Sequence, residues 1–137
     1  MSKEKLYIFD TTLRDGAQTQ GVDFSIDDKE KISNSLDNLG VDYIEGGWPG
    51  ANPTDTEFFN KDHWFKNAKF TAFGMTKKSE HSAENDPMLA SLINSKCSSV
   101  CLFGKSWDFQ VDVALGITHE ENLENISESA KHFVKAK

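Results

Sequence analysis

The sequence predicts an α/β protein in which four parallel strands alternate with four helices. Short runs rich in β-branched and aromatic residues recur roughly every 30 residues and are bounded by polar or glycine-containing segments. Stretches with helical spacing and recognisable start signals lie between these runs. The predicted strands are 6–9, 41–44, 70–73 and 100–103.

The helix expected after the first strand has signals at both ends. Ser25 is followed three residues later by Asp28, which is the spacing of a capping box. Gly40 marks the end, because glycine readily adopts the left-handed conformation that closes many helices. The apolar residues expected to face the sheet are Ile32, Leu36 and Leu39.

The next two helices each start at a polar residue followed by proline, a favoured first helical residue. Asn52 and Pro53 open the second, where Thr54 and Glu57 also have capping-box spacing and Phe58 or Phe59 is expected to be buried. Asp86 and Pro87 open the third, and its packed residues are expected to be Leu89, Leu92 and Ile93.

The fourth helix is the longest of the predicted set. Thr118 and Glu121 stand at capping-box spacing before an amphipathic stretch. Its apolar face is predicted to consist of Leu123, Ile126, Ala130, Phe133 and Val134.

Composition limits the partners of this 137-residue chain, of which 37% is hydrophobic and 27% charged. The formal net charge of -7 argues against nucleic-acid and anionic-membrane partners, because binding phosphates requires a basic face. No apolar run approaches the ~20 residues that span a bilayer, and no signal-peptide apolar region opens the sequence. We therefore expect a cytoplasmic protein with a small-molecule or protein partner.

Two architectures share the predicted alternation: a short doubly wound sheet of flavodoxin type and the first half of an eight-stranded barrel. Periodicity alone does not separate them. The segment after the first strand, DGAQTQG at residues 15–21, has the wrong glycine spacing for either common phosphate-binding loop. This observation counts against a nucleotide-binding doubly wound sheet.

A polar cluster follows the first strand, at the end where parallel α/β folds bind ligands. Arg14 places a fixed cation beside Asp15, a hard oxygen ligand. Such a pair suits chemistry in which a divalent metal holds a keto acid and a guanidinium stabilises an enolate oxygen. The same pair also fits an ordinary surface turn, so spacing alone leaves both interpretations open.

Three motifs carry a family resemblance. DTTLRDGAQ at residues 10–18 closely resembles the opening signature of the isopropylmalate, homocitrate and citramalate synthases, whose superfamily includes hydroxymethylglutaryl-CoA lyase and the carboxyltransferase domains of pyruvate carboxylase. YIEGGWPGANP at 43–53 and FGKSWDF at 103–109 resemble motifs of the citramalate synthase branch. The resemblance implies that residues 1–137 form the N-terminal half of a (β/α)8 TIM barrel, as the first four βα units of a catalytic domain.

The implied reaction is an acyl transfer in which acetyl-CoA condenses with a 2-keto acid, pyruvate, and thioester hydrolysis releases citramalate and CoA. By this resemblance Asp15 would be a ligand of a divalent metal, Mg, Mn or Zn. Arg14 would be catalytic, binding the keto oxygen and stabilising the enolate charge.

The resemblance also implies the remaining substrate contacts. Gln18 and Glu45 would be polar groups around the site, and Ser106 a substrate-binding residue in the loop after the fourth strand. Phe73, with Leu102 or Phe103, would line the pocket for the side chain of the acceptor. Strand-end apolar residues are also common core residues, so packing is the alternative role for these positions.

Two departures from the family pattern affect the expected site. Gln110 stands where the branch usually has histidine, which keeps a hydrogen-bonding group but removes an imidazole. The later metal ligands of the family fall beyond Lys137, and one carboxylate does not hold a metal selectively. Of the four histidines only His81 is expected in a loop on the ligand-binding face. We therefore expect an incomplete metal site, and either a homo-oligomer or a missing C-terminal half that completes the barrel.

Two other functions stay open from the sequence. The chain could belong to an isopropylmalate or homocitrate synthase or a related lyase, or it could be a non-catalytic fragment that only assembles or binds. Cys97 and Cys101 are spaced C-x3-C, which matches neither redox nor zinc-ribbon spacing. We expect both to be packed free thiols.

Overall fold

The structure is a computed structural model that describes residues 4–136. Its four strands form one sheet in the order β1-β2-β3-β4. β1 pairs with β2 and β2 with β3, in both cases in parallel. The strands are β1 (Phe9–Asp10), β2 (Tyr43–Gly47), β3 (Lys69–Met75) and β4 (Ser99–Phe103). The predicted strand order and alternation are confirmed.

Helices occupy each connection between strands, as predicted. The long ones are α1 (Ile26–Leu39), α2 (Pro53–Asn60), α3 (Pro87–Asn94) and α5 (His119–Ala136). Three short turns were not expected from the sequence: the 3₁₀ turn η1 (Gly16–Gln18), the helical turn α4 (Asp108–Gln110) and the π-helical turn η2 (Val111–Leu115). They lie in the loops that follow β1 and β4.

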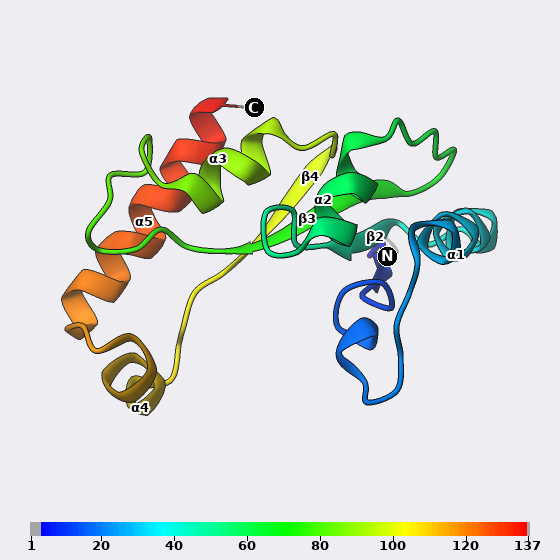
Figure 1. Cartoon of the computed structure of the whole chain (residues 1–137). Helices are drawn as coiled ribbons and strands as arrows, with labels where there is room; N and C mark the ends of the chain where they lie inside the picture. Colours follow the sequence, from blue (N-terminus) through cyan, green and yellow to red (C-terminus); the bar gives the residue numbers. More distant parts are fainter. Residues whose placement is uncertain (1–3, 137) are drawn as a thin grey trace. The chain divides into compact units, whose positions relative to one another are not determined.

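The chain divides into two compact units, whose helices and strands are labelled in Figure 1. The first unit contains the described residues up to Phe73 together with Ser95–Cys101, and therefore includes β1, β2, α1 and α2. The second contains Gly74–Asn94 and the described residues from Leu102 onward, and therefore includes α3, α4 and α5. Residues of β3 and β4 contribute to both.

The core of the first unit is aromatic. Phe58 and Phe59 of α2 are 0% and 1% exposed, so both of the alternatives considered for this helix are buried. Their rings meet Phe70 of β3 at centroid distances of 5.4 and 4.5 Å. Gly46 lets this packing occur, because a Cβ there would lie 2.4 Å from the Phe70 ring. α2 is thereby fixed on the sheet just beyond the end of β2.

α1 packs through a polar face, contrary to the prediction. Its ends are as expected: Ser25 and Asp28 form a capping box, and Gly40 closes the helix with φ of 88°. The predicted face is wrong at Leu39, which is 78% exposed. The buried residues are Lys29, Ser33 and Asp37, so the buried face of α1 is turned by about one residue from the predicted face. Lys29 and Asp37 bind groups of neighbouring loops, as described below, whereas the Ser33 hydroxyl donates to the carbonyl oxygen of Glu30 in the same helix at 3.0 Å.

Asp37 shows how a polar residue replaces apolar packing on α1. Its carboxylate accepts hydrogen bonds of 2.8 Å from the backbone N–H groups of Lys66, Asn67 and Ala68, just before β3. Burial by itself would raise the pKa of Asp37, but these three N–H donors outweigh it and lower the pKa below the ordinary value. The α1 carboxylate thus fixes the start of β3.

The first strand is shorter than predicted. Residues 6–8 lie outside β1, and Leu6, Tyr7 and Ile8 are 87%, 61% and 60% exposed. β1 is at an edge of the sheet, with β2 as its neighbour, so little covers this apolar run in the part of the chain that the structure describes. The prediction of a strand over 6–9 is therefore wrong except at Phe9.

In the second unit, α3 lies alongside α5 (Figure 1). Leu89 and Leu92 of α3 are fully buried, as predicted. Thr118 and Glu121 form the predicted reciprocal cap of α5 at 2.9 and 3.1 Å. The predicted apolar face of α5 is wrong at Leu123, Ala130 and Val134, which are exposed, whereas Ile126 and Phe133 are half-buried. The fully buried side chains are Asn122, Asn125 and Ser129.

Buried Lys77 accounts for the polar face of α5. Its Nζ donates to Asn125 Oδ1 at 2.9 Å and pairs with Glu128 at 3.0 Å, while its backbone N–H donates to Ser129 Oγ at 2.9 Å. A buried lysine is stable only when such partners are present. Asn125, Glu128 and Ser129 therefore turn inward to meet it, whereas Asn122 donates to the backbone oxygen of Lys105 at 2.9 Å.

The starts of α2 and α3 lie at the predicted polar residues. The side chain of Asn52 caps α2 by accepting from Asp55 N at 2.8 Å, and Thr54 lies inside the helix. At α3, Asp86 accepts from the backbone N–H groups of Met88 and Leu89 at 2.9 and 3.0 Å. Within residues 4–136 the structure has no helix long and apolar enough to span a membrane.

Candidate active site

The loop after β1 turns sharply and brings its charged residues back toward the sheet. The carbonyl oxygen of Thr11 accepts from the backbone N–H groups of Arg14, Asp15 and Gly16 at 3.1, 2.8 and 3.1 Å. Asp10 fixes the start of the turn by accepting from the backbone N–H and hydroxyl of Thr12. The geometry places Arg14 and Asp15 at the C-terminal end of β1, where the sequence predicted a site.

Arg14 is held between two carboxylates. Its Nε donates to Glu45 Oε2 at 2.7 Å, and its Nη1 donates to Asp15 Oδ1 at 3.0 Å. The side chain of Glu45 in β2 is 1% exposed, whereas that of Asp15 is 62% exposed. The buried pair therefore sets the orientation of the guanidinium, and these two bonds leave other N–H donors of its planar fork for a ligand.

Two aromatic rings lie beneath the arginine. The Cζ atom of Arg14 is 4.2 Å from the ring centroid of Phe73. Phe73 is the last residue of β3 that belongs to the first unit. The Trp48 ring meets the Phe73 ring edge-on, with the ring centroids 5.5 Å apart and the ring planes at 81°. A guanidinium over an aromatic face is attracted by the ring's quadrupole. Trp48, Phe73 and Arg14 thus form a continuous stack.

Cys101 of β4 borders the same carboxylate. Its thiol is within hydrogen-bonding reach of Glu45. Burial raises the pKa of the Cys101 thiol, and the negative charge of Glu45 raises the pKa further. The thiol therefore stays protonated at neutral pH. Both cysteines are free thiols, as predicted.

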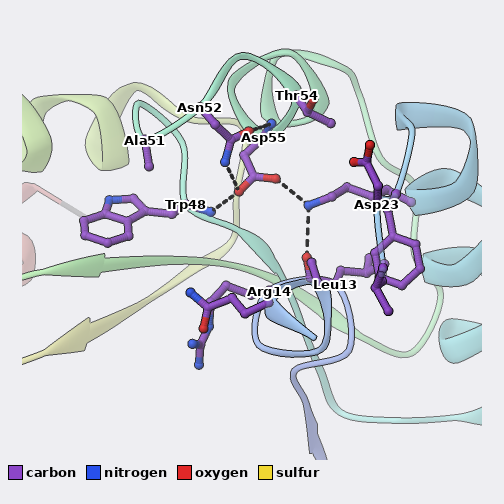
Figure 2. Close-up of a pocket in the computed structure, with 13 residues that line it drawn as sticks. Leu13, Arg14, Asp23, Trp48, Ala51, Asn52, Thr54 and Asp55 are labelled. Carbon is purple, nitrogen blue, oxygen red and sulfur yellow. Dashed lines mark hydrogen bonds and ion pairs between the residues drawn. The ribbon is translucent and has the colours of Figure 1, made fainter. Parts of the chain in front are cut away.

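A buried ion pair supports the loops around the arginine. Lys29 of α1 donates to the carbonyl oxygens of Leu13 and Gly46 at 3.0 and 2.9 Å, and it pairs with Asp55 of α2. Figure 2 shows Asp55 in turn accepting from the backbone of Trp48 at 2.9 Å and from Asn52 at 3.0 Å. One lysine thus ties together the loop after β1, the end of β2 and the start of α2.

Gly47 is required for this arrangement. Its φ of 145° lies in the region that L side chains rarely adopt. A Cβ at this position would lie 2.5 Å from the carboxyl carbon of Asp55. The glycine therefore lets the carboxylate approach the backbone closely enough to bind Trp48.

A pocket of about 420 Å³ opens beside these residues, between the loop after β1 and the loop after β2 (Figure 2). Arg14 and Gln18 line one side of it, and Trp48 and Asn52 line the other. The side chain of Gln18 is exposed there, as a ligand-binding group requires. The structure therefore brings four predicted residues into contact or close proximity around Arg14: Asp15, Gln18, Glu45 and Phe73.

The other two predicted substrate contacts, Phe103 and Ser106, belong to the second unit. Phe103 is 44% exposed with Lys105 Nζ 5.2 Å from its ring centroid, and Ser106 is exposed. The backbone oxygen of His81 accepts from Lys77 at 3.0 Å in the same unit. These roles in substrate or metal binding stay predictions.

The described residues do not fit a complete metal centre. Within 4–136 no group of three or more histidine, cysteine, aspartate or glutamate side chains is placed to hold a metal ion. The exposed carboxylate of Asp15 is already paired with Arg14. A single carboxylate of this kind is too small a ligand set for a divalent cation.

Comparison with known proteins places the chain in a family. The family model described as HMGL-like matches residues 5–136. The chain is 52% identical over 132 residues to an (R)-citramalate synthase of Aquifex aeolicus, covering 95% of this chain and 25% of that protein. It is 46% identical over 135 residues to the (R)-citramalate synthase of Sulfolobus acidocaldarius, covering 97% and 26%.

A more distant relative is 2-isopropylmalate synthase 1 of Caldanaerobacter subterraneus, 35% identical over 133 residues and covering 96% of this chain and 32% of that protein. The chain belongs to the HMGL-like family. Its four strands and alternating helices are the N-terminal half of that family's TIM barrel. It spans about a quarter of the length of the (R)-citramalate synthases it matches.

Sequence reasoning missed Lys29 and Asp55, and it treated Cys101 as a packing residue. A signal for Lys29 was present: with Ser33 and Asp37 it forms a polar stripe at i, i+4 and i+8, which predicts a common helix face. No local pattern marks Asp55 or Cys101, because their partners lie on other elements.

Proposed function

We propose that this chain carries the acceptor-binding arginine of an acyltransferase that condenses acetyl-CoA with a 2-keto acid, pyruvate. The α-carbon of acetyl-CoA would lose a proton and form a carbon–carbon bond to the keto carbon, whose oxygen becomes a hydroxyl. Water would then cleave the thioester, giving citramalate and CoA with its free thiol. Support comes from the names of the (R)-citramalate synthase relatives and from the setting of Arg14.

The observation that carries the proposal is the buried pair of Arg14 and Glu45, with a 2.7 Å bond from Nε and a carboxylate that is 1% exposed. Donors fixed in advance at the place where negative charge develops stabilise a transition state without reorganising. Arg14 would donate to the keto oxygen, and Glu45 and Asp15 would orient it. Cys101 would donate to Glu45 and so share in that orientation.

The remaining residues have proposed roles around the acceptor. Gln18 would donate a hydrogen bond from the pocket wall, and Phe73 would face the acceptor's side chain. Phe103 and Ser106 are proposed as further substrate contacts. Asp15 stays a predicted metal ligand, and no step is assigned to a metal because the described residues do not supply a full ligand set.

The wider organisation is also a proposal. Residues 1–137 would form part of one barrel-type catalytic domain, completed either by a second copy of the chain or by a C-terminal half. A cytoplasmic location stays a prediction. The second candidate function is an isopropylmalate synthase type of reaction with a larger acceptor, favoured by the 35% identity to 2-isopropylmalate synthase 1.

A chimera tests the proposed reaction. The chain would replace the matching segment of the Aquifex aeolicus (R)-citramalate synthase, to which it is 52% identical. CoA release would be followed with a thiol reagent in the presence of acetyl-CoA and pyruvate, with the isolated chain assayed in parallel. We expect pyruvate-dependent CoA release by the chimera.

Matched variants assign the activity to Arg14. Arg14→Lys keeps the charge but loses the planar fork, and we expect it to lower kcat/KM by about 10²–10³-fold. The exposed Lys31 of α1 provides the control Lys31→Met, which should leave the rate unchanged. A chimera without pyruvate-dependent CoA release would contradict the proposal and leave the non-catalytic alternative.

A further inference from the structure

Trp48 is the feature of the site that packing stability does not explain. Its indole Nε1 is buried and has no hydrogen-bond partner among the described residues. A buried N–H without a partner costs free energy, and such groups are rare in folded proteins. Phenylalanine would keep an aromatic edge against Phe73 without this cost. The larger ring therefore needs another explanation.

The position of the indole is fixed from both sides. Its backbone N–H is bound by Asp55 Oδ2 at 2.9 Å, and Asp55 is held by the buried Lys29. Its ring is 5.5 Å from the ring of Phe73 and nearly perpendicular to it. Trp48 therefore acts as a rigid support, because neither its main chain nor its ring is placed by a flexible contact.

Phe73 contacts both the indole of Trp48 and the guanidinium of Arg14. The Phe73 ring is 9% exposed and lies 4.2 Å from Arg14 Cζ. A ligand held by the guanidinium must share this space with the Phe73 ring. The indole packs edge-on against the Phe73 ring, so a smaller ring at position 48 would leave room for Phe73 to shift and would enlarge the space next to the ligand.

We infer that Trp48 is a specificity-determining residue that limits the size of the 2-keto acid by holding Phe73 beneath Arg14. This inference rests on the proposed function, because it concerns which 2-keto acids the same site accepts. It predicts that a smaller ring at position 48 lets Phe73 move back and admits acceptors with longer side chains. One methylene in an apolar pocket is typically worth 10–200-fold in discrimination.

The test uses Trp48→Phe in the chimera, with kcat/KM measured for pyruvate and for 2-keto acids that are one, two and three carbons longer. We expect the ratio of kcat/KM for the longer acids over pyruvate to rise by roughly tenfold. The matched control is Trp64→Phe, because Trp64 lies in the same unit and is 89% exposed. That variant should leave the ratio unchanged.

A second variant and a melting curve separate specificity from stability. Trp48→Met should raise the same ratio, and Trp48→Phe should melt at the parent temperature or above it, since it removes the unpaired N–H. An unchanged ratio in both variants overturns the inference. A uniform loss of rate with all acceptors, accompanied by a lower melting temperature, also overturns it and indicates a packing role. A parent chimera that condenses no 2-keto acid overturns the proposed function itself, so the two failures are distinguishable.

Discussion

The buried pair of Lys29 and Asp55 makes the sharpest prediction about stability. Their side chains are 4% and 11% exposed, and Lys29 also binds the carbonyl oxygens of Leu13 and Gly46. Lys29→Met would leave the Asp55 carboxylate buried without its cation and would leave two carbonyl groups without a donor. Breaking a buried pair in this way costs about 3–5 kcal/mol.

The expected loss of stability in Lys29→Met is large for a chain of 137 residues. At about 3–4 °C per kcal/mol, the melting temperature should fall by roughly 10–20 °C. The assays are thermal unfolding and urea unfolding of the chain, both followed by far-UV circular dichroism and compared with Lys31→Met on the exposed face of the same helix. The control should stay within about 0.5 kcal/mol of the parent.

A double-mutant cycle isolates the pair. Asp55→Asn alone should also destabilise the chain, and the double variant should be destabilised by clearly less than the sum of the two single variants. The reasoning is refuted if Lys29→Met is as stable as Lys31→Met, or if the single effects simply add.

Three further predictions concern other positions. Gly47→Ala should cost roughly 1–3 kcal/mol in urea unfolding, because φ at this position is 145° and the new Cβ would meet Asp55. The control Gly21→Ala should cost less, because a Cβ at position 21 would meet no atom within 4 Å. Asp37→Asn should destabilise at pH 7, and its difference from the parent should begin to shrink below about pH 4 and keep shrinking as the pH falls through the lower folded pKa of Asp37. The lowered pKa of Asp37 gives stability that is present above the unfolded value of about 3.9 and lost as pH falls through the lower folded value; a pH-independent difference in urea midpoint would contradict this. Thr118→Ala should cost about 1 kcal/mol by removing the cap of α5, measured by thermal unfolding, and an unchanged melt would mean that the cap is not formed.

Local signals predicted the ends of elements well. The capping box at Ser25, the closing Gly40 and the cap at Thr118 all depend on a few neighbouring residues, so a sequence can reveal them. The same is true of Arg14 and Asp15, whose place after β1 follows from the strand that precedes them. These features involve little long-range structure.

The faces of the long helices were not predictable in the same way. Amphipathic spacing suggested Leu39 on α1 and Leu123 and Val134 on α5 as packed residues, yet all three are exposed. Polar side chains took their place because Lys29 and Lys77 bind groups brought together only by the fold. Hydrophobic periodicity carries no information about such partners.

The candidate site was also predicted only in part from the sequence. Arg14 and Glu45 were identified through motifs and Phe73 through its place at the end of the third strand. In the structure Arg14 bonds to Glu45 and stacks on Phe73. Trp48, as the support of that stack, could not be assigned beforehand, since its role depends on a ring in another strand and on an unpaired N–H. Tertiary contacts of this kind have no signature in a single sequence.

The claim on which the account depends is that Arg14 holds the 2-keto acid. Arg14 is the only arginine among the 137 residues, and its side chain is 21% exposed, so an arginine-selective dicarbonyl reagent can reach it. The measurement is the rate at which the peptide carrying Arg14 is modified in the chimera, followed by mass spectrometry with and without pyruvate. The account predicts that pyruvate slows this modification several-fold while acetate at the same concentration does not, and equal rates under all three conditions would contradict it.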